Sequence, residues 1–466
     1  MYLFIALNFL ALQANANFST LQQVGLSLPP LIQSLSEDKE LLHFLKKTGA
    51  QISLAPIQKS RWGKTISVEL SIDGILIEGA TQKIHFKRNE FSPIGNLDFQ
   101  PFEIPSKKGI KSREEVSLWI PHGRETLKTL PQLALVKTEN TFQAQWIYRA
   151  ITDFSEYLFE AKTGALIAEI PHFHTFEPIY VGHAPSDQQV TSRGDFLDLD
   201  IEKVWWTVLQ NQPMPIGEPD KDILRAQKNA QQVYHYFSEH FDRHSYDNKD
   251  SSLKNVVHVG KNWANAFWHR WDHYMAYGDG DGIQTGSFTL ATDVAGHEMT
   301  HGIISETSRL SGYGEMGALN EALSDFFGEM LSDPTPKWSL GEDLWLDPLK
   351  KVFGLRYLKK PSILGHPEKR SEKITTEGPC TSLNDQCYVH HNSTIFSHTM
   401  VKITEQLGIS KGEILFYEVM TRYLHRYSGV NHFAKATLEA CKSIDVFNEN
   451  DCSTVEDELI NSELLN

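Results

Sequence analysis

The segment His297-Glu298-Met299-Thr300-His301 constrains the fold of this chain more than any other stretch. Residues four apart lie on one face of a helix, so His297 and His301 can direct ring nitrogens toward one ion, with Glu298 beside the remaining coordination position. A pentapeptide of this kind arises by chance in about one chain in twenty of this length and composition. The motif therefore needs support from elsewhere in the sequence.

That support comes from a second helical stretch that follows His301 and contains Glu321. Asn320 and Asp325 flank this glutamate, and their polar side chains are suited to hydrogen-bond and orient metal ligands. Two imidazoles and one carboxylate leave a fourth position of a tetrahedral zinc ion free for water, which is the arrangement of a catalytic site. The sequence thus predicts one Zn²⁺ per chain, with Glu298 as the general base.

Length and charge limit the classes of partner. A chain of 466 residues that is 40% hydrophobic is long enough for two or three domains, each with its own core. The formal net charge of -15 argues against nucleic acid or an anionic membrane as the partner, and no basic cluster offsets it. Neither nucleic acid nor a membrane is therefore expected as a partner.

The first residues favour export of the chain. Residues 2–12 form an apolar run too short to cross a bilayer, and Ala14-Asn15-Ala16 resembles a cleavage signal. We expect a signal peptide at residues 1–16 and a secreted product, although no Lys or Arg precedes the run and a buried first helix is the alternative.

Cysteine usage agrees with an extracellular location. The four cysteines form two local pairs, Cys380 with Cys387 and Cys441 with Cys452, and no Cys-x-x-Cys metal motif. Two short-loop disulfides are predicted; four cysteines allow three connectivities, and free buried thiols are the other alternative.

The pattern of apolar residues changes along the chain. Alternation over 66–72 and 75–77 around Asp73-Gly74 predicts a hairpin, and further strands are expected at 146–149, 157–159 and 165–167. Residues 172–219, which are rich in Pro and Gly, mark a boundary. Helices are then expected at 222–240, 318–331, 392–407, 411–427 and 432–443. This order indicates an α+β protein with a β-rich N-terminal module.

Several ordered motifs closely resemble those of the thermolysin-like zinc metalloproteases. They are Asn265 to Trp268, Tyr277 to Gly282, His297 to His301, Gly317 to Asp325, Trp338 to Asp343 and Val389 to Ser393. The resemblance implies a two-lobed catalytic domain with a β-rich N-lobe, a central zinc helix and a helical C-lobe. It divides the chain into a signal peptide (1–16), a propeptide (17–171) of small sheets and helices, an N-lobe (172–310) and a C-lobe (311–466).

The same resemblance implies the role of each site residue. His297, His301 and Glu321 would be the zinc ligands, and Glu298 the base that activates water. His390, oriented by Asp385, would donate a hydrogen bond to the transition state. The substrate would be held by Asn265, Ala266 and Arg356, and a pocket for a bulky apolar residue on the amine side of the cut would be lined by Val294, Leu340, Leu344 and Leu355.

The implied activity is that of a secreted endopeptidase made as a precursor. Its own propeptide would be an inhibitor and a folding aid, and its substrates would be proteins or peptides. Two other classes remain open: a catalytically silent binding protein that keeps the fold, and a zinc aminopeptidase, for which no Gly-x-Met-Glu-Asn motif is present.

The sequence departs from the family pattern at two places. The tyrosine expected fifteen residues after the first zinc histidine is replaced by Gly312, with Tyr313 one position later, so either Tyr313 reaches the site or one oxyanion donor is lost. The usual double calcium site is expected to be lost. Asp293 and Glu342 fit it, but three acidic positions are occupied by Ser332, Lys337 and Ser339. Calcium bound elsewhere in the chain stays open.

Overall fold

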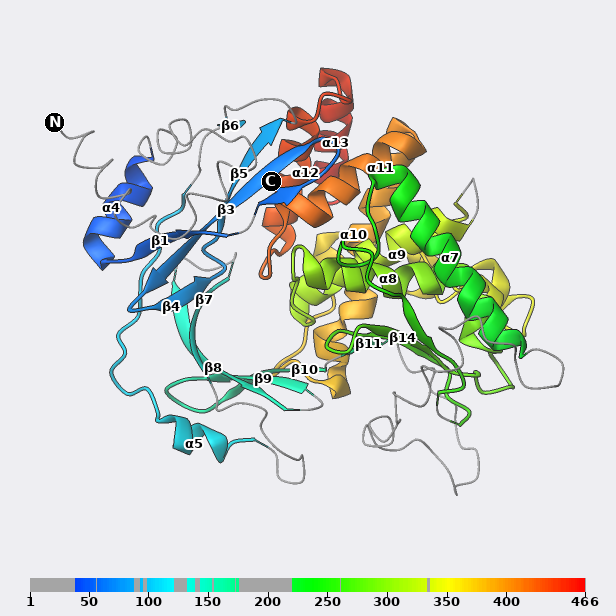
Figure 1. Ribbon diagram of the computed structural model, residues 1–466, viewed down its shortest axis with the longest axis horizontal. Helices are drawn as coiled ribbons and strands as arrows, with labels where there is room; N and C mark the ends of the chain where they lie inside the picture. The colour runs from blue at the N-terminus through cyan, green and yellow to red at the C-terminus, as the bar shows by residue number, and fades with distance from the viewer. Residues whose placement is uncertain are drawn as a thin grey trace.

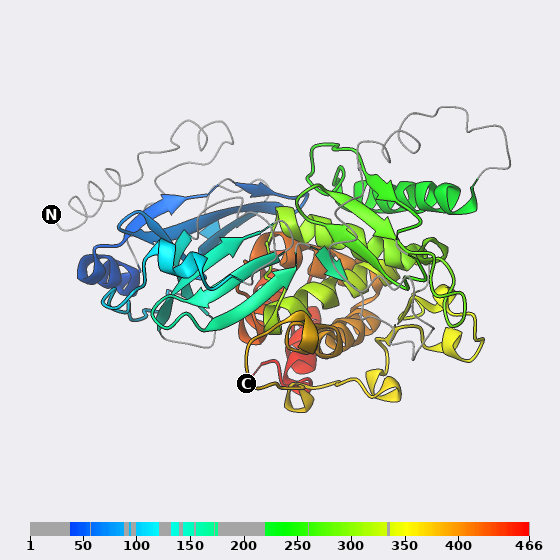
Figure 2. The ribbon, with the colours of Figure 1, turned by 90° about the horizontal axis from the view of Figure 1, so that it is seen from below.

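The computed structural model describes residues 38–55, 57–87, 93–94, 99–120, 132–138, 143–152, 155–171, 173–175, 220–259, 261–332 and 336–465. The expected signal peptide lies outside these residues, as does most of the expected boundary at 172–219. The structure mixes sheets and helices (Figures 1 and 2), which confirms the α+β class.

The N-terminal module is built on one large twisted sheet. The described strands pair in the order β10-β9-β8-β7-β4-β3-β5-β6, and β1 and β2 also pair with β3. Their bounds are β1 Gln51–Leu54, β2 Gln58–Lys59, β3 Gly63–Ile72, β4 Ile75–Glu78, β5 Gln82–Lys87, β6 Pro93–Ile94, β7 Gln132–Lys137, β8 Ala144–Ile151, β9 Ser155–Glu160 and β10 Leu166–Pro171. The predicted hairpin is confirmed as β3 and β4, with Asp73 and Gly74 both at positive φ.

Two short helices, α4 (Lys39–Thr48) and α5 (Arg113–Ser117), belong to the same module. Leu41, Phe44 and Leu45 recur at helical spacing in α4 and pack into the core of the sheet. The module therefore has a hydrophobic core that is distinct from that of the rest of the chain.

The second part of the chain is mainly helical. Its helices are α7 (Lys221–Phe241), α8 (Thr292–Glu306), α9 (Gly314–Ser332), α10 (Asp385–Leu407), α11 (Ile409–Glu418), the π-helix η8 (Val419–Tyr423), α12 (Val430–Ser443) and α13 (Glu449–Asn461). In Figure 1, α8, α9 and α10 overlap near the centre of this part, and α9 packs against both of the others. Every residue of α8 from Asp293 to Ile304 is buried, which makes α8 the central helix of the fold.

A small sheet covers one side of α8. Its strand order is β11-β13-β14-β12, with β11 at Phe173–Thr175, β12 at Lys254–Val256, β13 at Ala266–His269 and β14 at Tyr274–Tyr277. A two-stranded ribbon of β15 (Ser339–Leu340) and β16 (Arg356–Tyr357) follows α9. The β-rich N-lobe, central helix and helical C-lobe expected from the sequence are thus present.

Two expectations about helices need correction. The helix predicted at 411–427 ends as α-helix at Glu418 and continues as a π-helix to Tyr423, after which Leu424 is extended. The sequence analysis also missed α13, which Asn448 caps through a hydrogen bond to the amide of Asp451. Both disulfides, Cys380–Cys387 and Cys441–Cys452, are confirmed.

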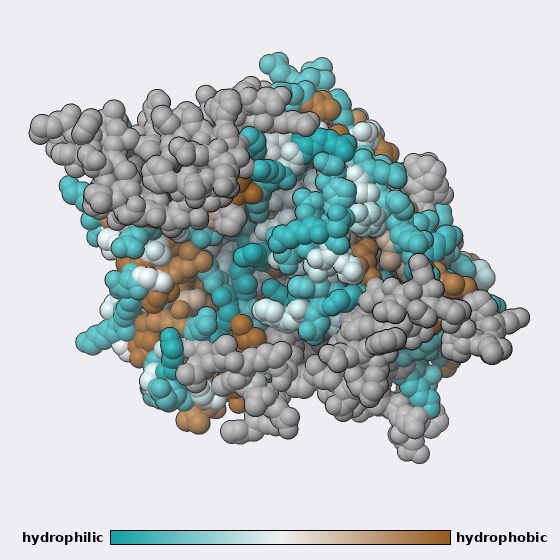
Figure 3. Space-filling model, viewed as in Figure 1, coloured by the Kyte–Doolittle hydropathy of each residue, from teal (hydrophilic) through white to brown (hydrophobic). Residues whose placement is uncertain are grey.

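The surface view is predominantly hydrophilic, with apolar patches over the N-terminal module on the left (Figure 3). Among the described residues, no helix combines the length and apolar character needed to cross a membrane.

Candidate metal centre

Close packing of α8 against α9 brings the candidate ligands together. A Cβ atom on Gly296 of α8 would lie 2.3 Å from Leu331 Cδ1, and one on Gly328 of α9 would lie 2.5 Å from the Asp293 carbonyl oxygen. Only glycine fits at these positions without displacing a neighbour. The two helices can therefore approach closely enough to face side chains toward a common point.

His297, His301 and Glu321 meet at that point. The two Nε2 atoms lie 2.9 Å apart, and the Glu321 carboxylate oxygens lie 3.3 Å from His297 Nε2 and 3.6 Å from His301 Nε2. All three residues are at least 98% buried. Two nitrogens and one carboxylate that converge in this way fit Zn²⁺ and leave one coordination position for water.

Hydrogen bonds to the opposite ring nitrogens orient both imidazoles. Asp325 Oδ1 lies 2.8 Å from His297 Nδ1, and Asn320 Oδ1 lies 3.0 Å from His301 Nδ1. Ser324 Oγ lies 3.1 Å from the same His301 nitrogen, a contact that the sequence analysis missed. Its position one turn past Asn320 on α9 was the available signal. These contacts leave both Nε2 atoms facing the common point.

Glu298 is fully buried beside this group. Burial is the main cause that raises the pKa of Glu298 to about 8; the charge of Glu321 also raises it, and those of His297 and His390 lower it. A cation bound by the neighbouring ligands would add positive charge and favour the carboxylate form. The group is thus placed to exchange a proton near neutral pH.

His390 and Asp385 also meet at the centre. Asp385 Oδ1 lies 2.6 Å from His390 Nδ1, and Asp385 Oδ2 accepts a hydrogen bond from the His390 amide at 3.0 Å. His390 Nε2 lies 3.4 Å from Glu321 Oε2. Burial lowers the pKa of His390, but the charges of Asp385 and Glu321 outweigh it and raise the pKa to about 9, so the ring is a hydrogen-bond donor at neutral pH.

A left-handed turn positions His390. Asp385, Gln386, Cys387 and Tyr388 all have positive φ, between 47° and 73°, before the chain enters the right-handed part of α10. Non-glycine residues adopt this conformation at a cost of roughly 1 to 2 kcal/mol each, so the surrounding contacts must hold it. The Cys380–Cys387 disulfide and the Asp385 hydrogen bonds supply such contacts, and the right-handed helix that was predicted to begin at 392 begins directly after Tyr388.

The candidate substrate strand is β13. Asn265 precedes it, accepts a hydrogen bond from the Ala266 amide through Oδ1 at 2.9 Å, and accepts another from the Gly278 amide through its carbonyl. One edge of β13 pairs with β14, and the other pairs with β11, where Thr175 faces Phe267 and Phe173 faces His269. The edge of β13 that faces away from β14 is therefore held by a segment that follows the N-terminal module directly.

Arg356 lies in β16, beside α9. Its Nε and Nη2 donate to the two oxygens of Asp325 at 2.7 and 2.6 Å, and the side chain is 3% exposed. Val294 and Leu355 belong to the same hydrophobic cluster as Leu340 and Leu344. These four residues belong to one extensive core, in which Leu344 and Leu355 both lie beside Gly341.

Tyr313 lies in a different environment from the zinc ligands. It packs against a cluster that includes Ile147, Leu158 and Ile170 of the N-terminal module and Met316 and Tyr427 of the C-lobe. Burial is the main cause that raises its pKa to about 12, and the charged groups that influence it are Arg426, Glu156, Arg149 and Glu78. In this structure Tyr313 is part of the contact with the N-terminal module.

The region of the expected calcium site contains a third carboxylate that the sequence analysis missed. Glu329, buried on α9, converges with Asp293 and Glu342, and Lys337 Nζ lies 2.9 Å from Glu342 Oε1. Burial and the neighbouring negative charges raise the pKa of Asp293 to about 7 and that of Glu329 well above its usual value. The Lys337 salt bridge supplies one positive charge to this group.

The sequence matches the model of the thermolysin metallopeptidase catalytic domain over residues 190–305 and that of the α-helical domain over residues 308–458. Bacillolysin of Bacillus amyloliquefaciens is 34% identical over 231 residues, which are 50% of this chain and 42% of the relative. Neutral protease NprE of Bacillus pumilus is also 34% identical over 231 residues, which are 50% of this chain and 73% of the relative.

A solved structure, the precursor of the metalloproteinase protealysin from Serratia proteamaculans, is 26% identical, with a TM-score of 0.48; the match covers 55% of this chain and 81% of that one. The match of the present chain covers less than half of the length of bacillolysin and about three quarters of the length of NprE. The two family matches and the coverage of NprE lead to one conclusion: this chain belongs to the thermolysin metallopeptidase family.

Proposed function

We propose that this chain is a secreted, zinc-dependent metalloendopeptidase, made as an inhibited precursor, that cuts peptide bonds on the amino side of bulky hydrophobic residues. The observation that carries the proposal is the convergence of His297, His301 and Glu321 beside the buried Glu298. Their donor set fits a zinc ion with an open position, and family membership implies the same metal.

A zinc ion held by these three ligands would supply a polarised water and a Lewis acid for the substrate carbonyl. Glu298 would take the proton of the attacking water and pass it to the leaving amine. His390, kept protonated by Asp385, would donate a hydrogen bond to the oxyanion. Arg356, held by Asp325, would bind the carbonyl on the far side of the scissile bond, while Asn265 and Ala266 would bind the substrate main chain.

The specificity follows from the apolar region near Arg356. Val294, Leu340 and Leu344 are fully buried, and Leu355 is partly exposed at its edge. An apolar side chain that enters beside Leu355 would bury its surface there, at about 25 cal/mol per Å². This supports a preference for large aliphatic or aromatic residues after the cut.

We propose that residues 17–171 are the propeptide and that the protease comprises an N-lobe (172–310) and a C-lobe (311–466). The support is the pairing of β11 with β13, because a substrate held by Asn265 and Ala266 would lie along this strand. The segment that follows the module thus occupies the edge where substrate would bind, so the precursor is inhibited. The cut that releases the module would lie after Thr175 and before α7, so that β11, which lies just beyond the 17–171 division, leaves with the module and frees this edge.

Substitution of Glu298 by Gln tests the mechanism. The variant should bind zinc with a stoichiometry of one, while casein hydrolysis and self-processing should fall by about a thousandfold or more, because no base remains to take the proton. Glu306→Gln, near the end of the same helix, is a matched control that should leave activity unchanged. Casein cleavage by Glu298→Gln at the rate of the parent protein would remove the general-base assignment.

A comparison of substrates separates the endopeptidase from the two alternative classes. Internally quenched peptides with blocked ends should be cleaved, and amino acid amides with a free amine should not. Cleavage of the amides alone would indicate an aminopeptidase, and no chelator-sensitive cleavage of either would indicate a binding protein.

A further inference from the structure

Glu156, on β9 of the N-terminal module, is a carboxylate buried at the contact with the protease. It is 2% exposed, and its Oε1 lies 2.5 Å from Arg149 Nε and 2.6 Å from Arg426 Nη2. The charges of Arg426, Arg149 and Arg270 lower the pKa of Glu156 to about 2, although burial opposes the shift. This carboxylate is therefore ionised and held by cationic groups from both parts of the chain.

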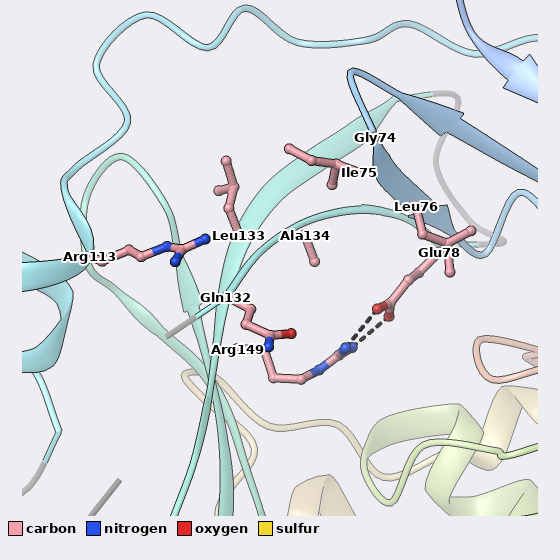
Figure 4. Close-up of a pocket in the computed structure, with 9 residues that line it drawn as sticks. All are labelled: Gly74, Ile75, Leu76, Glu78, Arg113, Gln132, Leu133, Ala134 and Arg149. Carbon is pink, nitrogen blue, oxygen red and sulfur yellow. Dashed lines mark hydrogen bonds and ion pairs between the residues drawn. The ribbon is translucent and has the colours of Figure 1, made fainter. Parts of the chain in front are cut away.

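Glu78, on β4 of the same module, is a second carboxylate at this contact. Arg149 donates to both Glu78 oxygens, at 2.7 and 2.6 Å, as Figure 4 shows. Tyr427 donates its hydroxyl to Glu78 Oε2 at 2.8 Å, and Arg426 Nε lies 3.8 Å from the same oxygen. Two carboxylates of the module are thus bound by residues of the C-lobe.

Removal of the module would separate these groups unequally. Glu78, Glu156 and Arg149 all precede β11 and would leave, while Arg270, Arg426 and Tyr427 would stay on the protease. Burial lowers the pKa of Arg270, and the positive charges of Arg426, Arg149 and Arg309 lower it further. The negative charge of Glu156 raises it, and the balance is a pKa of about 10. The mature enzyme would keep cationic donors arranged around a carboxylate position, without the carboxylates that fill it in the precursor.

The position that the Glu156 carboxylate fills lies next to the expected path of the substrate. Arg270 directly follows β13, and Phe173 of β11 pairs with His269, so a chain bound along β13 in the same direction would extend past Arg270 on its amino side. In the precursor that continuation is β10, which pairs with β9 such that Ile170 faces Glu156. An extended substrate would carry its own side chains toward the place that Glu156 now occupies.

We propose that Arg426, Arg270 and the Tyr427 hydroxyl form a binding site for an acidic side chain of the substrate, several residues to the amino side of the cleaved bond. In the precursor, Glu156 and Glu78 occupy this site as internal mimics of that side chain. The inference rests on the proposed peptidase activity, and it adds a preference that the apolar pocket near Leu355 does not explain.

The test uses processed, module-free enzyme and pairs of internally quenched peptides. The two peptides of a pair differ only by Glu or Gln, placed at successive positions on the amino side of the cut. At one or two of these positions the Glu peptide should have a KM lower by about tenfold with an unchanged kcat, because a charge-assisted hydrogen bond forms outside the reacting atoms. The preference should weaken as salt screens the interaction.

Arg426→Gln and Arg270→Gln should each reduce the ratio of kcat/KM for the Glu peptide to kcat/KM for the Gln peptide. Arg225→Gln, on the surface of α7, removes the same charge at a remote site and should change neither peptide. The substrate pairs need no variant, so they remain informative if Arg426→Gln disturbs folding of the precursor. Equal kcat/KM for Glu and Gln at every position would overturn the inference, whereas failure to cleave either peptide would count against the peptidase activity itself.

Discussion

Asp325 contacts His297 and Arg356 at the same time: its Oδ1 lies 2.8 Å from His297 Nδ1 and 2.6 Å from Arg356 Nη2. All three side chains are buried, so this carboxylate links the candidate zinc ligand to the candidate substrate-binding arginine. Burial raises the pKa of Asp325, but Arg356 and His297 lower it to below its usual value. The ionised carboxylate thereby fixes the ring of His297 with Nε2 toward the metal position.

Asp325→Asn should therefore weaken zinc binding by about ten- to a hundredfold, because an amide accepts the ring N–H less strongly and leaves Arg356 without its anion. Competition against a coloured chelator at fixed pH measures this change without any need for activity. Asp457→Asn, an exposed position on α13, is the control. An unchanged zinc affinity would show that Asp325 does not orient the ligand.

His390 and Tyr313 should differ in their importance for turnover. His390→Ala should lower kcat by about a hundred- to a thousandfold, as expected for loss of an oxyanion donor beside Glu321. Tyr313→Phe should lower kcat by less than about tenfold, because Tyr313 packs beside Met316 and Tyr427 of the C-lobe rather than against the zinc ligands. Single-turnover kinetics on the processed enzyme distinguish the two, and an equal loss in both variants would mean that Tyr313 moves to the site after processing.

Lys337 should limit the calcium dependence of stability. Its ammonium group lies beside the carboxylate of Glu342, which converges with those of Asp293 and Glu329, so calcium or a calcium chelator should change the melting temperature by less than about 2 °C. Lys337→Ala removes that charge and should make the protein more responsive to calcium. Lys359→Ala, which removes a charge from the exposed pair with Glu405, is the control. A large calcium effect on the unsubstituted protein would contradict this expectation.

The metal centre could be predicted from the sequence because its chemistry lies in local spacing. His297 and His301 are one helical turn apart, and the segment from Asn320 to Asp325 places its polar groups within two turns, so helical geometry alone fixes most of their relationship. The hairpin of β3 and β4 was predictable for the same reason, since Asp73-Gly74 selects the turn locally.

The contacts between the module and the C-lobe could not be predicted, because they join residues that are hundreds of positions apart. The buried Arg422 donates to Thr65 Oγ1 at 2.9 Å, and nothing in the sequence near either residue specifies this pairing. The left-handed turn at Asp385 was missed because tertiary contacts, rather than the preferences of its four non-glycine residues, hold it in place. Glu329 was missed because nothing in the sequence around it on α9 shows that its side chain converges with Asp293 and Glu342, which lie on other elements.

Lys83 should make the contact between the module and the C-lobe sensitive to pH. It lies on β5 of the module and donates a hydrogen bond to the carbonyl of Leu424 in the C-lobe. Burial, followed by the charge of Arg422, lowers the pKa of the Lys83 amine from 10.5 to about 7. His85 and His432 also lie nearby. His85 stacks on Tyr423, and burial and the positive charges of Arg422, Lys83 and His432 lower its pKa.

Between pH 7 and pH 10.5 the Lys83 amine carries a proton when the module is released and exposed to water, but lacks that proton when the module is docked. Docking of the module therefore releases a proton. Docking should strengthen as the pH rises through this range, by up to about tenfold per pH unit. Below pH 7 the Lys83 amine is protonated in both states, so it should no longer make docking depend on pH. In precursor that has been cut after Thr175, the module should therefore dissociate faster at pH 7 than at pH 9, and activity should return faster.

Lys83→Met should flatten this slope because it removes the titrating group, whereas Lys47→Met, an exposed residue of α4, should preserve it. The return of activity and the separation of the two fragments by size, followed together across pH 7 to 9, distinguish release of the module from a direct effect of pH on catalysis. If the Lys83 variant keeps the slope of the parent protein, the proton that is released on docking comes from another group.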